Sequence, residues 1–139
     1  MMNPIAGRFE GQVVLVVGGA QGIGKAIAAR LAREGAHLMI ADIDRPLLDR
    51  TKKELVAEGG SVRTVVCDVR RRSQVERTVT QVIRWHERID VLMYVAGVSK
   101  GMPFIQADEK LWDWVMNINL RGGFLFARAV APQMIKHRR

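Results

Sequence analysis

Short apolar runs recur along the chain at nearly regular intervals. Each run is five or six residues long and rich in β-branched side chains, and each is followed by a longer, more polar segment. Runs this short and this apolar are typical of strands that are buried on both faces of a parallel sheet. The predicted strands are residues 13–17, 37–41, 62–67 and 91–95.

The segments between these runs have the spacing and the end signals of helices. Gly35 is placed to end the first of them. The sequence Ser73-Gln74-Val75-Glu76 has the form of a capping box and predicts that the third helix opens at Ser73. The helices are expected at about 22–34, at about 46–58, from 73 onward, and from about 108 to the end of the chain with a bend at Pro132.

Strict alternation of strands and helices predicts a doubly wound α/β fold with right-handed crossovers. The third run carries Arg63 and Thr64 and is more polar than the others, which suits the edge of the sheet. We therefore expect the strand order 3-2-1-4, with a ligand crevice where the order reverses between strands 1 and 4. The 139 residues are 48% apolar and 26% charged, as expected for one globular domain over residues 1–139.

Glycines follow the first predicted strand directly. Gly18, Gly22 and Gly24 have the spacing G-x-x-x-G-x-G and lead into the first helix. The first turn of a helix has unpaired N–H groups and a partial positive charge, and glycine lets a phosphate approach the backbone closely. The turn is therefore a candidate diphosphate site, although a glycine-rich turn in any strand–helix unit would look similar.

An acidic residue closes the second predicted strand. Asp42 lies 18 positions after Gly24, near the offset at which a carboxylate binds the adenosine ribose of a dinucleotide. Such a carboxylate repels a 2′-phosphate, which favours NAD over NADP. The alternative is a cap on the next helix, but Asp44 fits that position better and leaves Asp42 for the ribose. Arg45 keeps NADP open as the less favoured cofactor.

Further motifs carry a resemblance to a known family. Cys67-Asp68-Val69, Ala96-Gly97 and Asn117-Ile118-Asn119-Leu120 follow in order after the glycine turn. With these motifs the chain resembles the N-terminal part of a short-chain dehydrogenase/reductase, a Rossmann-type oxidoreductase. The resemblance implies that Asp68 meets the adenine and that Asn119 is the catalytic asparagine. A helix-interior asparagine bonded to neighbouring backbone is the alternative for Asn119.

The resemblance also implies the rest of the cofactor site. NAD is expected to contact the glycine turn, the end of the second strand and the residues after the third and fourth strands. The expected cofactor-binding residues are Gly18, Gln21, Gly22, Ile23, Gly24, Asp42, Ile43, Asp68, Val69, Val95, Ala96 and Gly97.

Two departures from the family pattern affect what the chain can do. Val17 and the pair Tyr94-Val95 stand where the family has polar residues, so packing is expected to replace hydrogen bonds there. The family's Tyr-x-x-x-Lys pair, in which tyrosine is the general acid and base, is absent. The only tyrosine is Tyr94, and Val98 lies four positions after it.

The implied function is hydride transfer between nicotinamide and a ketone or secondary alcohol by an enzyme of which this sequence is a truncated or partial form. The chain alone is expected to be inactive. The alternatives are a non-catalytic dinucleotide-binding module and an interaction fragment. In the family the last helix pairs with its counterpart, so a homo-oligomer through that helix is expected. The residues that would reveal the substrate are not recognisable.

Charge and cysteine content narrow the partners and the compartment. Net charge is +8 from 22 basic and 14 acidic residues, clustered at Arg70–Arg72 and near the C-terminus. No aromatic residues interleave with these clusters, so we expect a solvated surface and no specific nucleic-acid partner. The three histidines are scattered and predict no metal site, and Cys67 is the only cysteine. With no apolar run long enough for a membrane span, the expected location is the cytoplasm.

Overall fold

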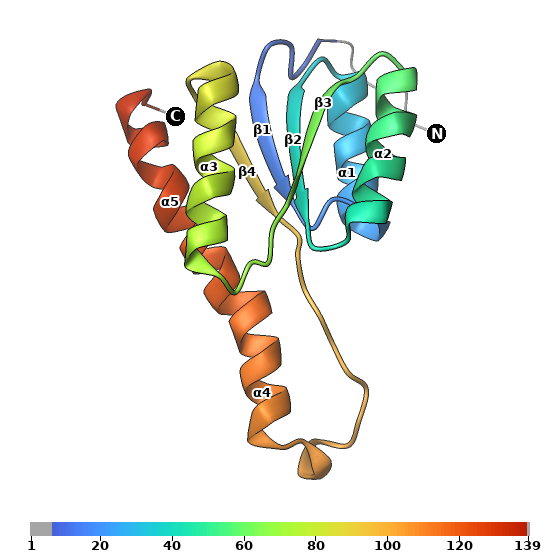
Figure 1. Cartoon of the computed structure of the whole chain (residues 1–139), viewed down its shortest axis with the longest axis vertical. Coiled ribbons are helices and arrows are strands. Elements are labelled where there is room, and N and C mark those ends of the chain that lie inside the picture. The colour runs from blue at the N-terminus through green and yellow to red at the C-terminus, as the bar shows by residue number, and fades with distance from the viewer. Residues whose placement is uncertain (1–6, 139) are drawn as a thin grey trace.

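The computed structural model describes residues 7–138, which form a four-stranded parallel sheet between two layers of helices (Figure 1). The strands are β1 (Val13–Val17), β2 (His37–Asp42), β3 (Ser61–Val66) and β4 (Val91–Tyr94). The helices are α1 (Gly22–Arg33), α2 (Arg45–Ala57), α3 (Arg72–His86), α4 (Glu109–Met116) and α5 (Gly122–Lys136). The order β3-β2-β1-β4 confirms the predicted topology and the edge position of the third strand.

The two faces of β1 belong to two separate cores. Val13, Leu15 and Val17 pack in the core under α3 and α5. Val14 and Val16 pack in the core under α1 and α2. Because successive side chains of a strand point to opposite faces, a continuous apolar run is what a strand between two helical layers requires.

The register brings the carboxyl ends of the strands to one level. Val17 at the end of β1 pairs with Ala41 of β2 and with Tyr94 of β4. The segments that follow β1, β2, β3 and β4 therefore leave the sheet along the same edge. This edge is the expected place for a ligand site in a doubly wound sheet.

The predicted capping box at Ser73 is wrong. α3 begins at Arg72, and its N-cap is Arg71, whose side chain makes no capping hydrogen bond. The chain enters α3 through a turn in which the Arg71 amide donates to the Asp68 carbonyl at 3.0 Å. Glu76 forms an ion pair with Arg72 at 2.7 Å and does not reach back to Ser73.

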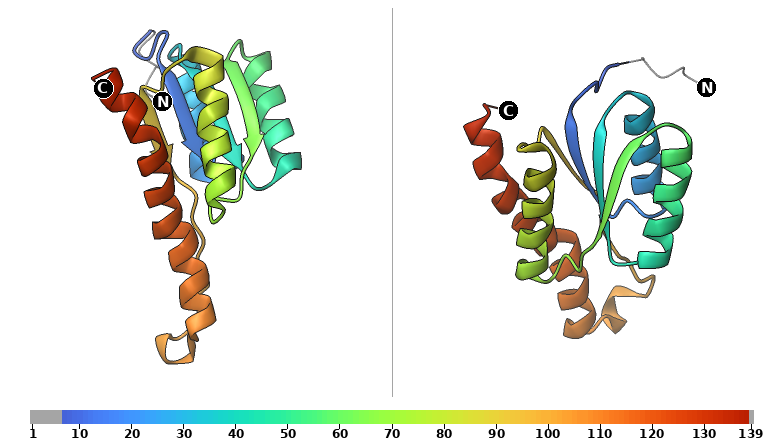
Figure 2. Two further views of the ribbon diagram at one scale, coloured as in Figure 1. Left: turned by 60° about the vertical axis from the view of Figure 1, so that its left-hand side comes forward. Right: turned by 45° about the horizontal axis from the view of Figure 1, so that its top comes forward.

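The last helix is longer and less regular than the others. Asp108 caps α4 by accepting a hydrogen bond from the Leu111 amide at 2.8 Å. A π-helical segment, Asn117–Arg121, joins α4 to α5, and α5 continues through Pro132 to Lys136. The departure from α-helical geometry thus falls at Asn117–Arg121, and Pro132 does not end the helix. α4 extends beyond the carboxyl edge of the sheet (Figures 1 and 2).

No helix within residues 7–138 combines the length and the apolar character that a membrane crossing requires.

Candidate functional site

A cavity of about 490 Å³ lies at the carboxyl edge of the sheet, between the ends of β1, β2, β3 and β4. Eleven of the twelve predicted cofactor residues line this cavity, and only Gly22 does not. Trp114 and Ile118 add an apolar wall from the last helix. The lining residues are Gly18, Gln21, Ile23, Gly24, Asp42, Ile43, Cys67, Asp68, Val69, Arg70, Val95, Ala96, Gly97, Val98, Trp114 and Ile118.

The glycine turn is held by close backbone contacts. Gly18 has a positive φ of 83°, and a Cβ there would lie 2.5 Å from the Ala96 amide nitrogen. A Cβ on Gly24 would overlap the carbonyl oxygen of Gly18. Any larger residue at either position would have to push the end of β4 or the start of α1 away. Both glycines are therefore required by the local packing as well as by any ligand.

Backbone hydrogen bonds join β1 to the segment after β4, where the family has polar side chains. The Val17 carbonyl accepts from the Val95 amide at 2.8 Å and from the Ala96 amide at 2.9 Å. Val17 itself is fully buried. Main-chain pairing thus holds the two strand ends together without the family's side chains.

The start of α1 is open to an anion. α1 has no side-chain cap and no acidic residue in its first turn, unlike α2 and α4, which are capped by Asp44 and Asp108. Gly22 has a φ of 55°, and a Cβ there would meet no atom within 4 Å. The first-turn N–H groups of α1 can therefore receive a phosphate, and the residues present fit a dinucleotide.

Asp42 lines the cavity, as the sequence predicted. Its carboxylate also accepts hydrogen bonds from backbone amides, which the sequence did not indicate. Its Oδ2 accepts a hydrogen bond from the Ala20 amide at 3.0 Å, and its Oδ1 accepts one from the Ile43 amide at 2.8 Å. Asp44 caps α2 through the Leu47 amide at 3.0 Å, as predicted. Asp42 thus ties the glycine turn to the end of β2 and orients its charge at the cavity.

Thr51 is a supporting residue that sequence reasoning missed. It lies inside α2 and is 1% exposed, and its hydroxyl donates to the Ala20 carbonyl at 2.7 Å. The glycine turn is therefore held from Asp42 on one side and from α2 on the other. A threonine inside a helix gives no sequence signal of this contact.

Asp68 is engaged by an arginine two residues away. Arg70 donates from Nε to Oδ1 at 2.9 Å and from Nη2 to Oδ2 at 2.7 Å. Hydrogen bonding from Arg70 outweighs burial and lowers the pKa of Asp68 below its usual range. The basic run at Arg70–Arg72, predicted as a solvated surface, therefore includes a residue of the cavity wall.

Asn119 bonds to backbone from a distant part of the chain. Its Oδ1 accepts from the Val98 amide at 2.8 Å, and its Nδ2 donates to the Val98 carbonyl at 2.9 Å. Asn119 lies in the π-helical segment, close to Gly97. These bonds to backbone agree with the structural alternative for Asn119, although Val98 follows β4 and is 21 residues away in sequence. The catalytic role of Asn119 stays a prediction.

Neither Cys67 nor the histidines belong to a metal-binding cluster among residues 7–138. Cys67 is buried, and burial raises the pKa of its thiol, as for an inert core residue. Within the described part of the chain, no three His, Cys, Asp or Glu side chains gather closely enough to hold a metal ion.

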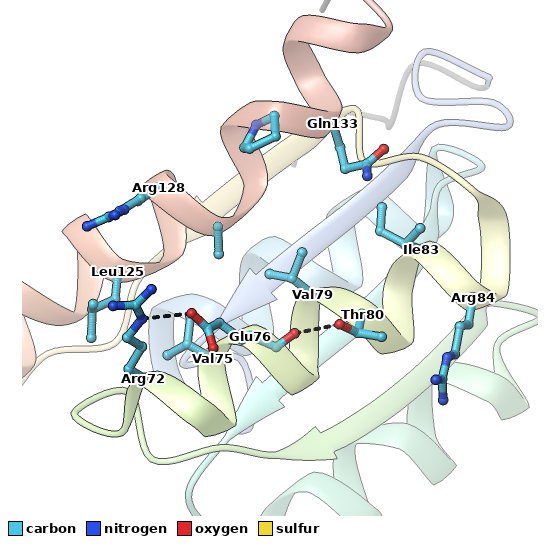
Figure 3. A pocket seen from close by; sticks show the side chains of 12 residues that line it. Arg72, Val75, Glu76, Val79, Thr80, Ile83, Arg84, Leu125, Arg128 and Gln133 are labelled. Atoms are coloured by element: carbon cyan, nitrogen blue, oxygen red, sulfur yellow. Dashed lines mark hydrogen bonds and ion pairs between the residues drawn. The ribbon is translucent and has the colours of Figure 1, made fainter.

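A second hollow, of about 450 Å³, lies between α3 and α5 (Figure 3). Val75 and Val79 of α3 and Leu125 of α5 line it, and the Arg72–Glu76 ion pair lies beside it (Figure 3). None of the predicted cofactor residues and no part of the glycine turn contributes to this hollow. The cavity at the sheet edge is therefore the candidate site.

Comparison with known proteins agrees with this geometry. The family model for short chain dehydrogenases matches residues 12–139. The chain is 40% identical to the 3-oxoacyl-(acyl-carrier-protein) reductase FabG of Thermotoga maritima over 131 residues, which cover 94% of this chain and 53% of that protein. The chain therefore belongs to the short-chain dehydrogenase/reductase family, and it spans about half the length of the curated relatives it matches.

Solved structures of the family superpose closely on this fold. A short-chain dehydrogenase/reductase from Burkholderia phymatum in complex with NAD has a TM-score of 0.90 at 30% identity, covering 94% of this chain and 47% of that one. A metagenomic short-chain oxidoreductase in complex with NADP has a TM-score of 0.89 at 36% identity, covering 94% of this chain and 60% of that one. Similar structures thus include complexes with either cofactor.

Proposed function

We propose that the cavity at the sheet edge binds the adenosine diphosphate half of NAD, in an oxidoreductase that transfers hydride between nicotinamide and a ketone or secondary alcohol. The observation that carries the proposal is the convergence of the uncapped start of α1, the Asp42 carboxylate and the segment after β4 on one cavity. NAD, when bound, supplies the ring that donates or accepts the hydride. The residues of this chain hold and orient the dinucleotide.

Asp42 supports NAD as the preferred cofactor. Its two oxygens are held at the cavity by the Ala20 and Ile43 amides, so the negative charge cannot swing away from an incoming 2′-phosphate. A phosphate group beside a fixed carboxylate is disfavoured, whereas ribose hydroxyls can donate to it.

Calorimetric titration and thermal unfolding test the binding of NAD and the preference for NAD over NADP. We expect NAD to bind, to raise the melting temperature, and to bind at least about tenfold more tightly than NADP. Asp42→Asn should reduce that preference several-fold. Asp44→Asn is the matched control, because it changes a carboxylate that caps α2 and does not line the cavity. Absence of heat and of thermal stabilisation at millimolar NAD would overturn the proposal.

We propose that these 139 residues bind the cofactor without turning a substrate over. The printed sequence has no Tyr-x-x-x-Lys pair, and its one tyrosine is Tyr94. Tyr94 is unsuited to acid–base work, since burial raises its pKa to about 12. The expected result is NAD binding without carbonyl-dependent oxidation of NADH, and measurable turnover would contradict it. We also propose a cytoplasmic location, which agrees with a single buried cysteine that cannot form an internal disulfide.

We also propose self-association through the last helix. Trp112, Leu120 and Phe124 are each about 60% exposed, whereas Phe126 is buried. Water-exposed apolar side chains in such number on one long helix are a common mark of an interface. Sedimentation should give a dimer or larger species, and Phe124→Glu should give a monomer. Val56→Glu, an exposed apolar position on α2, is the control and should leave the association unchanged.

A further inference from the structure

One wall of the cavity at the sheet edge is aromatic, and the contacts described so far leave it unused. Trp114 of α4 lines the cavity one helical turn before Ile118, and it is the one aromatic side chain among the described residues of the lining. Trp114 is 37% exposed, whereas Trp112 is 60% exposed. Residues two positions apart in an α-helix point about 200° apart, so the two indoles lie on opposite sides of α4.

The base of a bound nucleotide belongs at the end of the cavity formed by residues 68–70, after β3. The proposed function places the phosphates at the start of α1 and the ribose at Asp42, and the base continues from the ribose away from α1. A purine has two flat faces, which stack favourably on aromatic side chains. Trp114 is the side chain of the lining that offers such a face.

The last helix turns the side that carries Trp114 toward the segment after β3. Ile118 packs against the buried cluster that contains Val69. Nη1 of Arg121 donates to the Arg70 carbonyl at 3.0 Å. Residues three and four positions apart are neighbours on one side of a helix, so Trp114 continues the side on which Ile118 and Arg121 lie. The indole therefore borders the end of the cavity where the base is expected.

We propose that the indole of Trp114 stacks on the purine of the bound nucleotide and forms the outer wall of its site. This inference rests on the proposed function, because it concerns the base of the nucleotide in that cavity. It is compatible with the contact to the base that the family resemblance implies for Asp68, since a carboxylate accepts from the edge of a base and an indole contacts its face. Stacking adds affinity without requiring a particular pattern of donors and acceptors.

Affinity for ADP tests the contact, because ADP has the base, the ribose and the phosphates of this half without the nicotinamide. Calorimetric titration should give about tenfold weaker binding for Trp114→Ala, a typical value for one base stacked on an aromatic ring. Trp114→Phe should keep most of the affinity, because it keeps a flat ring. Phe104→Ala is the control, since Phe104 is an exposed aromatic residue that does not line the cavity. Its affinity should stay within about twofold of wild type.

Tryptophan fluorescence tests the stacking itself. A purine that stacks on an indole quenches its emission, and the chain has three tryptophans, Trp85, Trp112 and Trp114. Saturation with ADP should quench the emission of wild type and of Trp112→Phe. The emission of Trp114→Phe should stay unquenched, although this variant still binds ADP. A purely structural role of Trp114 would not produce this pattern.

The outcomes separate this inference from the proposed function. If Trp114→Ala binds ADP as tightly as wild type, or if ADP quenches Trp114→Phe as strongly as wild type, the inference is overturned while nucleotide binding stands. If wild type binds neither ADP nor NAD, the proposed function fails. The quenching of Trp114→Phe requires only a conservative substitution, so it decides the question even if Trp114→Ala does not fold.

Discussion

The hydroxyl of Tyr94 donates a hydrogen bond to the carbonyl of Ile118, which joins the last residue of β4 to the π-helical segment. Gly122 and Gly123 face the tyrosine ring and leave room for it. The same π-helical segment carries Asn119, whose side chain holds Val98 after β4. Two contacts therefore fix the irregular part of the last helix, one to Tyr94 at the end of β4 and one to Val98 just after it.

Tyr94 is predicted to ionise at an unusually high pH. Burial, with a smaller contribution from Cys67, raises its pKa from about 10 to about 12. Because Tyr94 is the only tyrosine, absorbance of tyrosinate near 295 nm reports on this residue alone. The folded chain should titrate near pH 12, and the chain in denaturant near pH 10.

The raised pKa of Tyr94 makes the free energy of unfolding depend on pH. The folded state favours the protonated phenol, so the contribution of Tyr94 is complete below pH 10 and is lost as the pH rises from 10 to 12. Tyr94→Phe should be less stable than wild type by about 1 kcal/mol at pH 8, and the gap should shrink by pH 11. A folded-state titration near pH 10 would contradict the burial of the hydroxyl.

Gly122→Ala is predicted to destabilise the chain by about 1–3 kcal/mol, as overpacking does. An added Cβ would overlap the Tyr94 hydroxyl and lie 3.0 Å from Cγ2 of Val69. Part of the loss should be recovered in Gly122→Ala combined with Tyr94→Phe, since the double variant lacks the hydroxyl. Chemical denaturation of the four species measures this coupling.

The control for Gly122 is Gly101→Ala, where a Cβ would meet no atom within 4 Å. It should change the free energy of unfolding by less than about 0.5 kcal/mol. Strict additivity of the Gly122 and Tyr94 changes would show that the two side chains do not compete for the same space.

Thr51→Val is predicted to loosen the glycine turn. The buried hydroxyl is replaced by a methyl group of similar size, and the Ala20 carbonyl loses the donor it has at 2.7 Å. We expect a loss of about 1–2 kcal/mol in stability and weaker binding of NAD. Thr80→Val is the control, because its hydroxyl donates to the Glu76 carbonyl at the surface of α3. Equal effects of the two substitutions would count against a special role for Thr51.

Sequence reasoning was sufficient for the sheet and for most of the cavity lining. Val13–Val17 is apolar on both faces and had to lie between two helical layers, and the polar Arg63 and Thr64 had to lie near an edge. Strict alternation then left few topologies to choose from. The glycine turn and Asp42 lie at the ends of neighbouring parallel strands, so their meeting at one edge follows from the topology.

The partners of individual side chains could not be read from the sequence. Thr51 and Ala20 lie 31 residues apart, and the contact depends on how closely α2 packs on the turn. Tyr94 reaches Ile118 only because the helix has a π-helical segment there, which no periodicity indicated. The error at Ser73 has a similar origin, because the turn at Asp68 had already set the start of α3.

Glu34 gives a prediction for acid stability, because it is a fully buried carboxylate at the end of α1. Nε of Arg8 donates to it at 2.6 Å, and Arg30 donates from one turn earlier in the helix. Burial alone would raise its pKa, but the hydrogen bonds from Arg30 and Arg8 together outweigh burial and lower the pKa below the ordinary value of 4.5.

A carboxyl with a lowered folded-state pKa stabilises the fold above about pH 4.5 and loses that contribution as the pH falls further. Glu34→Gln should therefore be clearly less stable than wild type at pH 7, and the difference measured by urea denaturation should shrink at pH 3.5. Glu58→Gln, which breaks only the exposed pair with Arg33, should have a small effect at both pH values. A Glu34→Gln deficit that stays constant between pH 7 and pH 3.5 would mean that the charge on Glu34 contributes nothing and that packing alone explains the loss.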